Sequence, residues 1–230
     1  MRGEFGHQTA MQIVIGDVLK SDELAATRAA LENVRFVDGK DTAGFAARRV
    51  KDNRQADASD HGLDAIRALV AKRIMENELF RIAVRPKQLS SLLFSRYEPG
   101  MEYGSHVDDA LMAGMRTDVA FTLFLEDPAD YVGGELVIES AGGDDAVKLP
   151  AGTMIAYPAT TLHRVAEVTR GRRHVAAGWA RSFIRDAAQR ELLFDLDTAR
   201  RTVFARDGKS AEFDLLSKSL ANLIRMWADD

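Results

Sequence analysis

The spacing of apolar residues changes at residue 88, and this change restricts the possible folds more than any other feature of the chain. Between residues 88 and 185, short runs of alternating apolar and polar residues are separated by glycine, proline and aspartate. A period of two is typical of half-buried β-strands, and the separating residues are typical of tight turns. The runs are "LSSLLFSRYE", "VAFTLFLE", "GELVIES", "AVKLP", "GTMIAYP", "LHRVAEV" and "RHVAAGWARSF". Seven short strands in succession predict a sandwich or a barrel.

Helical spacing flanks this part of the chain on both sides. Residues 21–33 begin with the capping residues Ser21 and Asp22 and continue with apolar residues three and four apart, which predicts a helix. Residues 62–80 carry one apolar stripe that should pack on a sheet: Leu63, Ile66, Leu69, Val70 and Ile74. After residue 185, "DAAQRELLFDLDTARRTVFA" and "AEFDLLSKSLANLIRMWADD" predict a C-terminal helical pair.

The chain has 230 residues, 46% of them hydrophobic, which is enough for one core. We therefore expect one β domain with supporting helices at residues 11–185 and a helical extension at residues 186–230. Residues 1–10 precede a second methionine, Met11, and we expect them to be a disordered leader or a cloning remnant. No internal repeat or flexible linker divides the chain.

Charge and cysteine content exclude several classes of function. The net charge is −4 and acids and bases are interspersed, so we expect neither a nucleic acid nor a membrane surface as partner. The chain has no cysteine, which excludes disulfides, thiolate zinc sites and cysteine nucleophiles. No apolar run has the length of a membrane span, and the first ten residues lack the apolar centre of a secretory signal. These features favour a cytoplasmic protein that binds small molecules or protein surfaces.

The motif H-x-D at His106 and Asp108 is the first candidate metal site. On a strand, residues i and i+2 point to the same face, so both side chains would project together while Val107 and Asp109 face away. A third ligand could come from His163 on a later strand. Two histidines and one carboxylate leave open positions on the metal, which suits Fe(II) enzymes that bind a cosubstrate and dioxygen. A single H-x-D motif also occurs as a hydrogen-bonded surface pair, and the spacing alone leaves both interpretations open.

Arg173 opens the last predicted strand and shares one face with Val175, Ala177 and Trp179. If that apolar face points inward, the guanidinium is carried inside and needs a carboxylate partner, because a buried unpaired charge is costly. The partner could be an Asp or Glu of the protein, or the carboxylate of a ligand held by two parallel hydrogen bonds. The neighbouring Arg170 and Arg172 lie in a predicted turn and are expected in solvent.

Several segments together resemble the PKHD-type hydroxylases, Fe(II)- and 2-oxoglutarate-dependent dioxygenases related to prolyl and lysyl hydroxylases. The segments are "RYEPGMEYGSHVDDALM", "RTDVAFTLFLEDPADYVGGELVIES", "VKLPAGTMIAYPATTLHRVAEVTRGRRHVAAGWARSFIRD" and "LLFDLDTA". The resemblance runs from about residue 11 to the C-terminus and implies a double-stranded β-helix, or jelly-roll, core. It implies that His106, Asp108 and His163 bind Fe(II). It also implies that Arg173 and Tyr97 bind 2-oxoglutarate, with Tyr103 as the next candidate for lining that pocket.

The implied reaction is a hydroxylation that consumes dioxygen and 2-oxoglutarate and releases succinate and carbon dioxide, with ascorbate as a possible reductant. The resemblance permits a protein side chain or a small molecule as substrate, including a metal chelator linked to iron uptake. Residues 110–118, with Met112 and Met115, are our candidate for a lid on the substrate side.

Some residues depart from the family pattern or are expected to be structural. The chain has "HVDDA" where "HVDNA" is expected, and we interpret Asp109 as a rim or substrate contact. Gly133 and Gly134 before a strand should allow a bulge or a close backbone approach. We expect Asp118 to support a hydrogen-bond network. His7, His61 and His174 are expected outside the site.

Two other functions stay open at this stage. One is a hydrolase in which the same three ligands hold Zn(II) and activate water. The other is a non-catalytic sensor that binds iron or 2-oxoglutarate without consuming it. The oligomeric state is equally open, since the apolar stripe of residues 215–227 could pack on the barrel or on a second subunit, with a homodimer slightly favoured.

Overall fold

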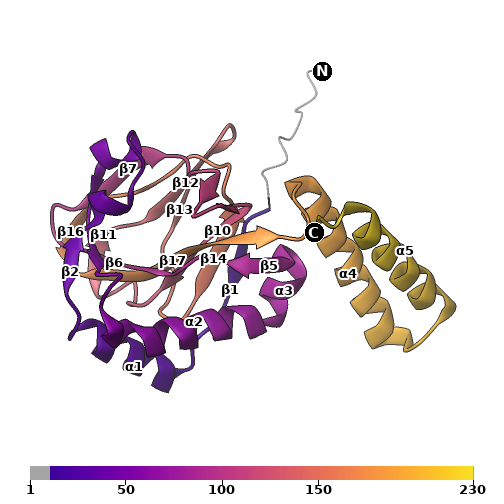
Figure 1. Cartoon of the computed structure of the whole chain (residues 1–230). Helices are drawn as coiled ribbons and strands as arrows, with labels where there is room; N and C mark the ends of the chain where they lie inside the picture. The colour runs from indigo at the N-terminus through magenta and orange to yellow at the C-terminus, as the bar shows by residue number, and fades with distance from the viewer. Residues whose placement is uncertain (1–10, 230) are drawn as a thin grey trace.

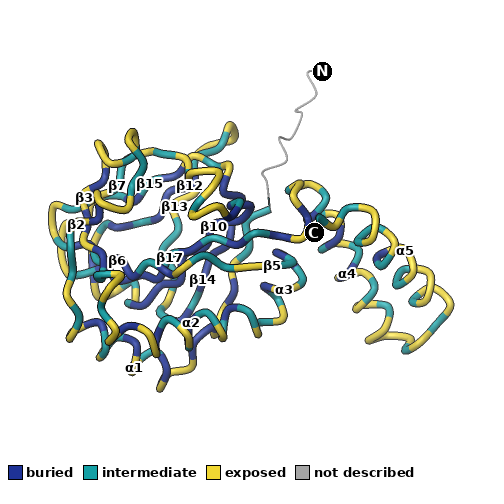
Figure 2. Tube along the Cα trace, viewed as in Figure 1, coloured by how far each residue is buried: buried dark blue, intermediate teal, exposed yellow. Residues whose placement is uncertain are grey.

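The structure is a computed structural model that describes residues 11–229, so the expected leader and His7 lie outside the described residues. Two facing β-sheets form a barrel, three helices cover one of its outer faces, and two long helices project to one side (Figure 1). Buried segments concentrate in the strands and on the inner faces of the covering helices, whereas most of the projecting pair is exposed or half-buried (Figure 2). This arrangement is the jelly-roll core with flanking helices that the sequence predicts.

The larger sheet has eight antiparallel strands, with β5 paired to β17 beside the main path. In spatial order they are β1 (Ile13–Ile15), β14 (Met154–Pro158), β10 (Val119–Phe124), β17 (Arg173–Ser182), β6 (Leu93–Tyr97), β4 (Arg54–Ala56) and β2 (Phe36–Asp38), with β5 (Pro86–Leu89) at the side. Every residue of the central strand β10 is buried, because one face meets helices and the other faces the barrel interior.

The smaller sheet carries the metal-ligand motif. In spatial order its strands are β13 (Gly143–Val147), β12 (Leu136–Ser140), β15 (His163–Val165), β7 (Glu102–His106) and β3 (Lys51–Asp52). Two separate two-stranded ribbons accompany these sheets: β11 (Tyr131–Gly133) with β16 (Val168–Gly171), and β8 (Leu111–Met112) with β9 (Met115–Arg116). The two sheets therefore bring strands from distant parts of the sequence around one interior.

The covering helices are α1 (Ser21–Leu31), α2 (Asp64–Glu76) and α3 (Glu78–Val84), and single turns lie at η1 (Gly39–Thr42), η2 (Ala47–Arg49) and η3 (His61–Leu63). The predicted helix at 62–80 is divided at Asn77, whose side chain accepts a hydrogen bond from the Phe80 backbone N–H at 3.0 Å and so caps a new helix. Its predicted stripe does pack on the larger sheet: Leu63, Val70 and Ile74 are fully buried in one cluster with strand residues.

The C-terminal pair consists of α4 (Ala187–Asp207) and α5 (Ala211–Trp227), as predicted. Much of the apolar stripe of α5 packs within the pair, since Leu220, Leu223, Ile224 and Trp227 share a cluster with Leu193 and Ile184. Leu215 of the same stripe is 58% exposed. Within residues 11–229, no helix combines the length and the apolar character that crossing a bilayer requires.

The strand predictions need correction at four places. The run "AVKLP" contributes only Ala146 and Val147, the last two residues of β13, and the strand begins earlier, at Gly143. The run "LSSLLFSRYE" forms β6 and only the end of β5, because the Ser90 hydroxyl accepts from the Trp179 backbone N–H at 3.0 Å and interrupts the ladder. The run "LHRVAEV" divides into β15 and the start of β16. The short strands β2, β3 and β4 within residues 36–56 were not predicted, since their residues are mostly polar and show no apolar alternation.

Candidate metal and cosubstrate site

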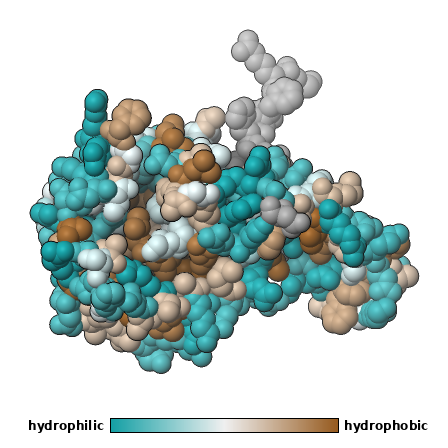
Figure 3. Space-filling model, in the orientation of Figure 1, coloured by the Kyte–Doolittle hydropathy of each residue, from teal (hydrophilic) through white to brown (hydrophobic). Residues whose placement is uncertain are grey.

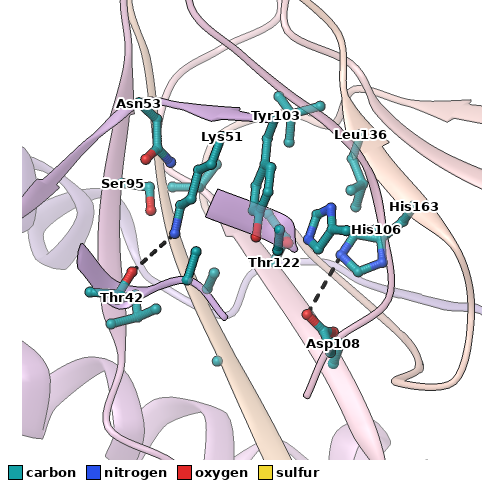
Figure 4. Close-up of a pocket in the computed structure, with 18 of the residues that line it drawn as sticks. Thr42, Lys51, Asn53, Ser95, Tyr103, His106, Asp108, Thr122, Leu136 and His163 are labelled. Atoms are coloured by element: carbon teal, nitrogen blue, oxygen red, sulfur yellow. Dashed lines mark hydrogen bonds and ion pairs between the residues drawn. The ribbon is translucent and has the colours of Figure 1, made fainter. Parts of the chain in front are cut away.

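The three predicted metal ligands come together at one end of the barrel interior. His106 is the last residue of β7 and His163 is the first of β15, and the two residues are directly opposite each other in the paired strands. Asp108 was expected on the same strand as His106, but it lies in the loop just after the strand ends. Even so, one ligand atom from each residue lies within 4.8 Å of the others. His163 Nε2 and Asp108 Oδ1 are 3.8 Å apart (Figure 4).

Backbone carbonyls fix both imidazoles. His106 Nδ1 is 2.9 Å from the Gly104 carbonyl oxygen, and His163 Nδ1 is 3.0 Å from that of Thr161. A carbonyl only accepts, so each Nδ1 carries a proton, and in the neutral form of either ring Nε2 has a free lone pair. This is the tautomer that a metal-binding histidine needs, and a carbonyl partner also holds the ring in orientation.

The pKa shifts of His106 and Asp108 also favour binding of a cation. Burial lowers the pKa of His106 to about 4, and the neighbouring His163 adds to the shift, so His106 is neutral at pH 7. Burial raises the pKa of Asp108. Among residues 11–229, nothing donates a hydrogen bond to Asp108 Oδ2, which is buried. The imidazole nitrogens thus converge with a carboxylate oxygen that no donor among the described residues satisfies, and this is the environment that a divalent metal ion fits.

Arg173 lies inside the barrel as the sequence predicts, with 1% of its surface exposed. Its guanidinium carbon is 5.0 Å from the ring centre of Tyr97, the residue opposite Arg173 in β6. In the described part of the chain no carboxylate lies within 4 Å of the guanidinium, and its Nε and Nη1 have no hydrogen-bond partner. A protein counter-ion was one of the two alternatives, and this arrangement favours the other, a ligand carboxylate.

The glycines before β12 leave room for this arginine. Gly133 has φ +76° at a register shift between β11 and β16, and a side chain there would meet the Glu167 carbonyl oxygen. A Cβ at Gly134, where φ is +68°, would lie 2.9 Å from Arg173 Cδ. The expected bulge and close approach are therefore both present.

One pocket of about 100 Å³ contains the metal ligands and Arg173, and also Tyr97 and Tyr103. The ring of Tyr103 stacks on that of His106, with 3.7 Å between centres. The inward face of β17 supplies further lining residues: Val175, Ala177 and Trp179. Burial raises the pKa of both tyrosines, so both hydroxyls keep their protons. The pocket thus unites all six predicted site residues.

The sequence did not reveal a second, polar part of the pocket, which we call the lysine arm: Lys51, Thr42, Asn53, Gln55 and Ser95. Lys51, Asn53 and Gln55 alternate with exposed residues along β3 and β4, and each is at most 4% exposed. The Lys51 ammonium donates to Thr42 Oγ1 at 3.0 Å, and Gln55 Nε2 lies 3.3 Å from Ser95 Oγ. Period-two spacing was the available signal, but an all-polar run is typical of an exposed strand.

The pocket mouth is partly apolar. Figure 3 shows apolar residues gathered over the barrel half of the molecule, with hydrophilic residues around them. Val107 lines the mouth and is 51% exposed, and Leu111 in the β8–β9 hairpin is 67% exposed. Met112 of the same hairpin lines the pocket, whereas Met115 is buried. Asp109 is exposed and also lines the mouth, as expected for a rim residue.

Of the residues expected outside the site, those that the structure describes do lie outside it. His174 is buried, and its Nδ1 is 2.8 Å from a carboxylate oxygen of Glu126. His61 is exposed beside Asp64. Asp118 pairs with Arg116 at 2.7 Å and accepts from the Ser182 backbone N–H, so it supports a network and does not compete for Arg173. The two turn arginines also stay outside, since Arg170 is exposed and Arg172 pairs with Glu32 at the surface.

Comparison with known proteins agrees with this geometry. Residues 92–181 match the family model described as the 2OG-Fe(II) oxygenase superfamily, and residues 187–229 match the PKHD-type hydroxylase C-terminal domain. A PKHD-type hydroxylase of Picosynechococcus sp. is 54% identical over 215 residues, which cover 94% of this chain and 98% of the relative.

Solved structures share the fold at lower identity. HygX from Streptomyces hygroscopicus, determined with nickel and 2-oxoglutarate bound, has a TM-score of 0.56 and 17% identity, covering 76% of this chain and 85% of its own. A Pseudomonas putida prolyl-4-hydroxylase has a TM-score of 0.52 and 19% identity, covering 76% and 94%. Family membership favours a 2-oxoglutarate-dependent dioxygenase over the zinc hydrolase and the sensor. The chain belongs to the PKHD-type hydroxylases.

Proposed function

We propose that this dioxygenase hydroxylates a C–H bond of a small molecule or a protein side chain, and converts 2-oxoglutarate and dioxygen into succinate and carbon dioxide. In this proposal His106, Asp108 and His163 hold Fe(II). Arg173, Tyr97 and Tyr103 hold 2-oxoglutarate. Small molecules to be tested include iron chelators, since a link to iron uptake was one expectation from the sequence. The observation that carries the proposal is the buried guanidinium of Arg173, which has no carboxylate partner among residues 11–229 and lies in the same pocket as the three ligands.

Each proposed role has support in the contacts of the side chain. The free Nε2 lone pairs of both histidines and the carboxylate of Asp108 form a donor set without thiolate, which suits Fe(II). When bound, the iron supplies the oxidising chemistry, and the protein supplies geometry and exclusion of water. Arg173 would take the distal carboxylate through paired hydrogen bonds, and the neighbouring Tyr97 hydroxyl would orient it.

The hairpin of β8 and β9 is the proposed lid on the substrate side. Its turn has positive φ at Ala113 and Gly114, and Met112 lines the pocket. Of the predicted lid at residues 110–118, the hairpin part at 110–116 is replaced by a short Gly/Ser loop. This change should spare uncoupled 2-oxoglutarate turnover and abolish coupled oxidation of the substrate. Loss of metal binding would identify this segment as scaffold.

We further propose the division into a dioxygenase domain at 11–185 and a helical extension at 186–230, a cytoplasmic location and a homodimer. The exposed apolar residues Phe204, Leu215 and Met226 of the helical pair support self-association. Sedimentation of the wild type and of Leu215→Glu measures it. A monomer at micromolar concentration contradicts the dimer.

The proposed reaction is tested by following succinate. Metal-free protein receives 2-oxoglutarate with either Fe(II) or Zn(II), in air or without oxygen, and with or without ascorbate. We expect succinate only with Fe(II) and oxygen, at a low rate that the true substrate increases. Absence of succinate with Fe(II) and oxygen would contradict the proposed reaction. Succinate formed with Zn(II) or without oxygen would contradict it as well, because the oxidant would then not be dioxygen activated at Fe(II).

A further inference from the structure

Lys51 is a buried cation that the proposed reaction does not yet use. It lies on β3, is 4% exposed, and lines the same pocket as the metal ligands. Throughout residues 11–229 no carboxylate comes within 4 Å of its ammonium group, and the hydrogen bond of that group goes to the neutral Thr42 hydroxyl. An ammonium has three donors, so others are available to a ligand. In this respect Lys51 resembles Arg173.

Stability does not explain a lysine at this position. Moving an ammonium from water into the protein is unfavourable unless an opposite charge compensates, and a packed apolar side chain of similar size avoids that cost. Burial lowers the pKa of Lys51 to about 8, which reflects the same cost, although the charges of Asp108 and Asp38, neither of them in contact with the ammonium, oppose the shift. A partner that arrives from outside the chain would compensate the charge.

The position of Lys51 separates it from the proposed 2-oxoglutarate residues. Its ammonium lies 5.0 Å from the ring centre of Tyr103, and the same ring stacks on His106. Figure 4 shows Lys51 and His106 on opposite sides of Tyr103, with Thr42, Asn53 and Ser95 around the lysine. Apart from the larger effect of burial, the charge of Lys51 lowers the pKa of His106 and of Asp108, whereas the charge of Arg173 lowers the pKa of Tyr97 and of Tyr157. The two cations thus serve different parts of the pocket.

The charge balance favours a second anion in addition to the cosubstrate. The dianion 2-oxoglutarate would offset a divalent metal ion, and Asp108 would offset either Arg173 or Lys51. Apart from Asp109, which lies at the solvent-exposed mouth, the lining of the loaded pocket then keeps a net positive charge. The lysine arm offers an oxyanion the Lys51 ammonium and, with a local change of partners, the Thr42 hydroxyl.

We propose that Lys51 recognises an oxyanion group, a carboxylate or a phosphate, on the primary substrate, and holds that group on the far side of Tyr103 from the metal ligands. This inference rests on the proposed function, because it assigns Arg173 to 2-oxoglutarate. The substrate is then an anionic molecule or an acidic side chain, and Lys51 sets its position relative to the metal.

The test uses small anions as probes of the lysine arm. Protein is loaded with redox-inert Mn(II) and saturating 2-oxoglutarate, and relaxation of the methyl protons of acetate, methyl phosphate and neutral acetamide is measured by NMR. Paramagnetic Mn(II) relaxes a methyl group that binds in the pocket. We expect strong relaxation of acetate or methyl phosphate and little of acetamide, and the stronger of the two anions identifies the substrate group.

Lys51→Met should weaken this anion binding about tenfold or more, the usual effect of losing a charge-assisted hydrogen bond. Lys72→Met removes an exposed lysine on α2 and should change nothing. The 2-oxoglutarate affinity of Lys51→Met, measured separately by calorimetry with Mn(II), should stay within about threefold of wild type. Lys51→Gln repeats the test if the methionine variant does not fold.

Two results would overturn the proposal. Anion relaxation that is unchanged in Lys51→Met would show that the anion binds elsewhere, for example on the metal itself. A loss of 2-oxoglutarate affinity in Lys51→Met comparable to that in Arg173→Met would make Lys51 a cosubstrate residue. Failure of the proposed function is distinct, because wild-type protein would then fail to bind 2-oxoglutarate with Mn(II).

Discussion

The two ends of the pocket are built differently. At the metal end, adjacent strands β7 and β15 place His106 opposite His163, and backbone carbonyls orient both rings. In the lysine arm, the short strands β3 and β4 pair with β7 and β6, and side-chain hydrogen bonds connect Lys51, Thr42 and Gln55. A metal site needs fixed geometry before the metal arrives, which backbone contacts supply. Side-chain contacts can exchange for a ligand, which suits an arm that recognises a substrate.

The largest effect should come from the metal end. Asp108→Ala removes one of three ligands, and we expect Fe(II) affinity to fall at least about a hundredfold, since changes in the outer shell alone cost 10–100-fold. Succinate formation should become undetectable. His61→Ala is the control, because His61 is exposed and pairs with Asp64 at the surface. Calorimetric titration of metal-free protein measures the loss, and unchanged Fe(II) affinity would remove Asp108 from the proposed ligands.

Arg173→Met should affect 2-oxoglutarate and spare the metal. Losing one partner of a buried charged pair costs about 2–5 kcal/mol, so we expect 2-oxoglutarate affinity to fall about a hundredfold or more. Arg172→Met is the matched control, since the adjacent Arg172 pairs with Glu32 at the surface. Titrations with 2-oxoglutarate after metal loading measure both variants. Equal effects of the two substitutions would contradict the assignment.

Lys51→Met should stabilise the ligand-free protein at pH 7. Burial lowers the pKa of Lys51 from 10.5 to about 8, so the unfolded chain binds more protons between these two pH values. The free energy of unfolding of the wild type therefore increases as pH rises through that window. Below pH 8 the wild type carries the full cost of burying the charged ammonium. We expect the variant to gain on the order of 2 kcal/mol at pH 7 and to lose this advantage near pH 10.

Urea unfolding of the metal-free proteins at pH 7 and pH 10 measures this gain, with Lys72→Met as the control. A variant that is less stable than wild type at pH 7 would show that Lys51 stabilises the fold. The proposed difference between a metal end with fixed geometry and a lysine arm that awaits a ligand would then be contradicted.

The smallest expected effect concerns the space beside Arg173. Gly134→Ala and Gly100→Ala both place alanine at positive φ, which costs about 1 kcal/mol of stability in each case. Only at Gly134 would the new Cβ also contact Arg173 Cδ, at 2.9 Å, whereas nothing lies within 4 Å at Gly100. We expect only Gly134→Ala to weaken 2-oxoglutarate binding, by about severalfold. Equal 2-oxoglutarate affinities of the two variants would mean that Arg173 moves away from the new Cβ without weakening its binding of 2-oxoglutarate.

The sequence predicted the metal end because its signals are local or strongly patterned. The H-x-D motif places two ligands almost together, and the alternation of β17 carries Arg173 inward with Val175 and Ala177. Asp108 was predicted on the same strand as His106, but it lies in the following loop because the strand ends at His106. Resemblance to the family supplied the specific roles of these residues, which spacing alone did not decide.

The lysine arm was missed for a physical reason. Lys51, Asn53 and Gln55 have the period of a strand, but without apolar residues the pattern does not say which face is buried. Their burial depends on pairing with β7 and β6, in which Tyr103 lies opposite Lys51 and Arg96 opposite Arg54, far along the chain. Only the folded structure shows that these polar side chains point into a pocket.

The central claim is that His106, Asp108 and His163 hold Fe(II) beside 2-oxoglutarate gripped by Arg173. Its most direct test is anaerobic titration of the metal-free protein with Fe(II) and 2-oxoglutarate, followed by the visible charge-transfer absorption of the chelated cosubstrate. We predict a band in the wild type, none in His106→Ala and a weaker one in Arg173→Ala, and decay of the wild-type band with succinate formation when oxygen is admitted. No band with Fe(II), together with tight Zn(II) binding, would contradict the claim.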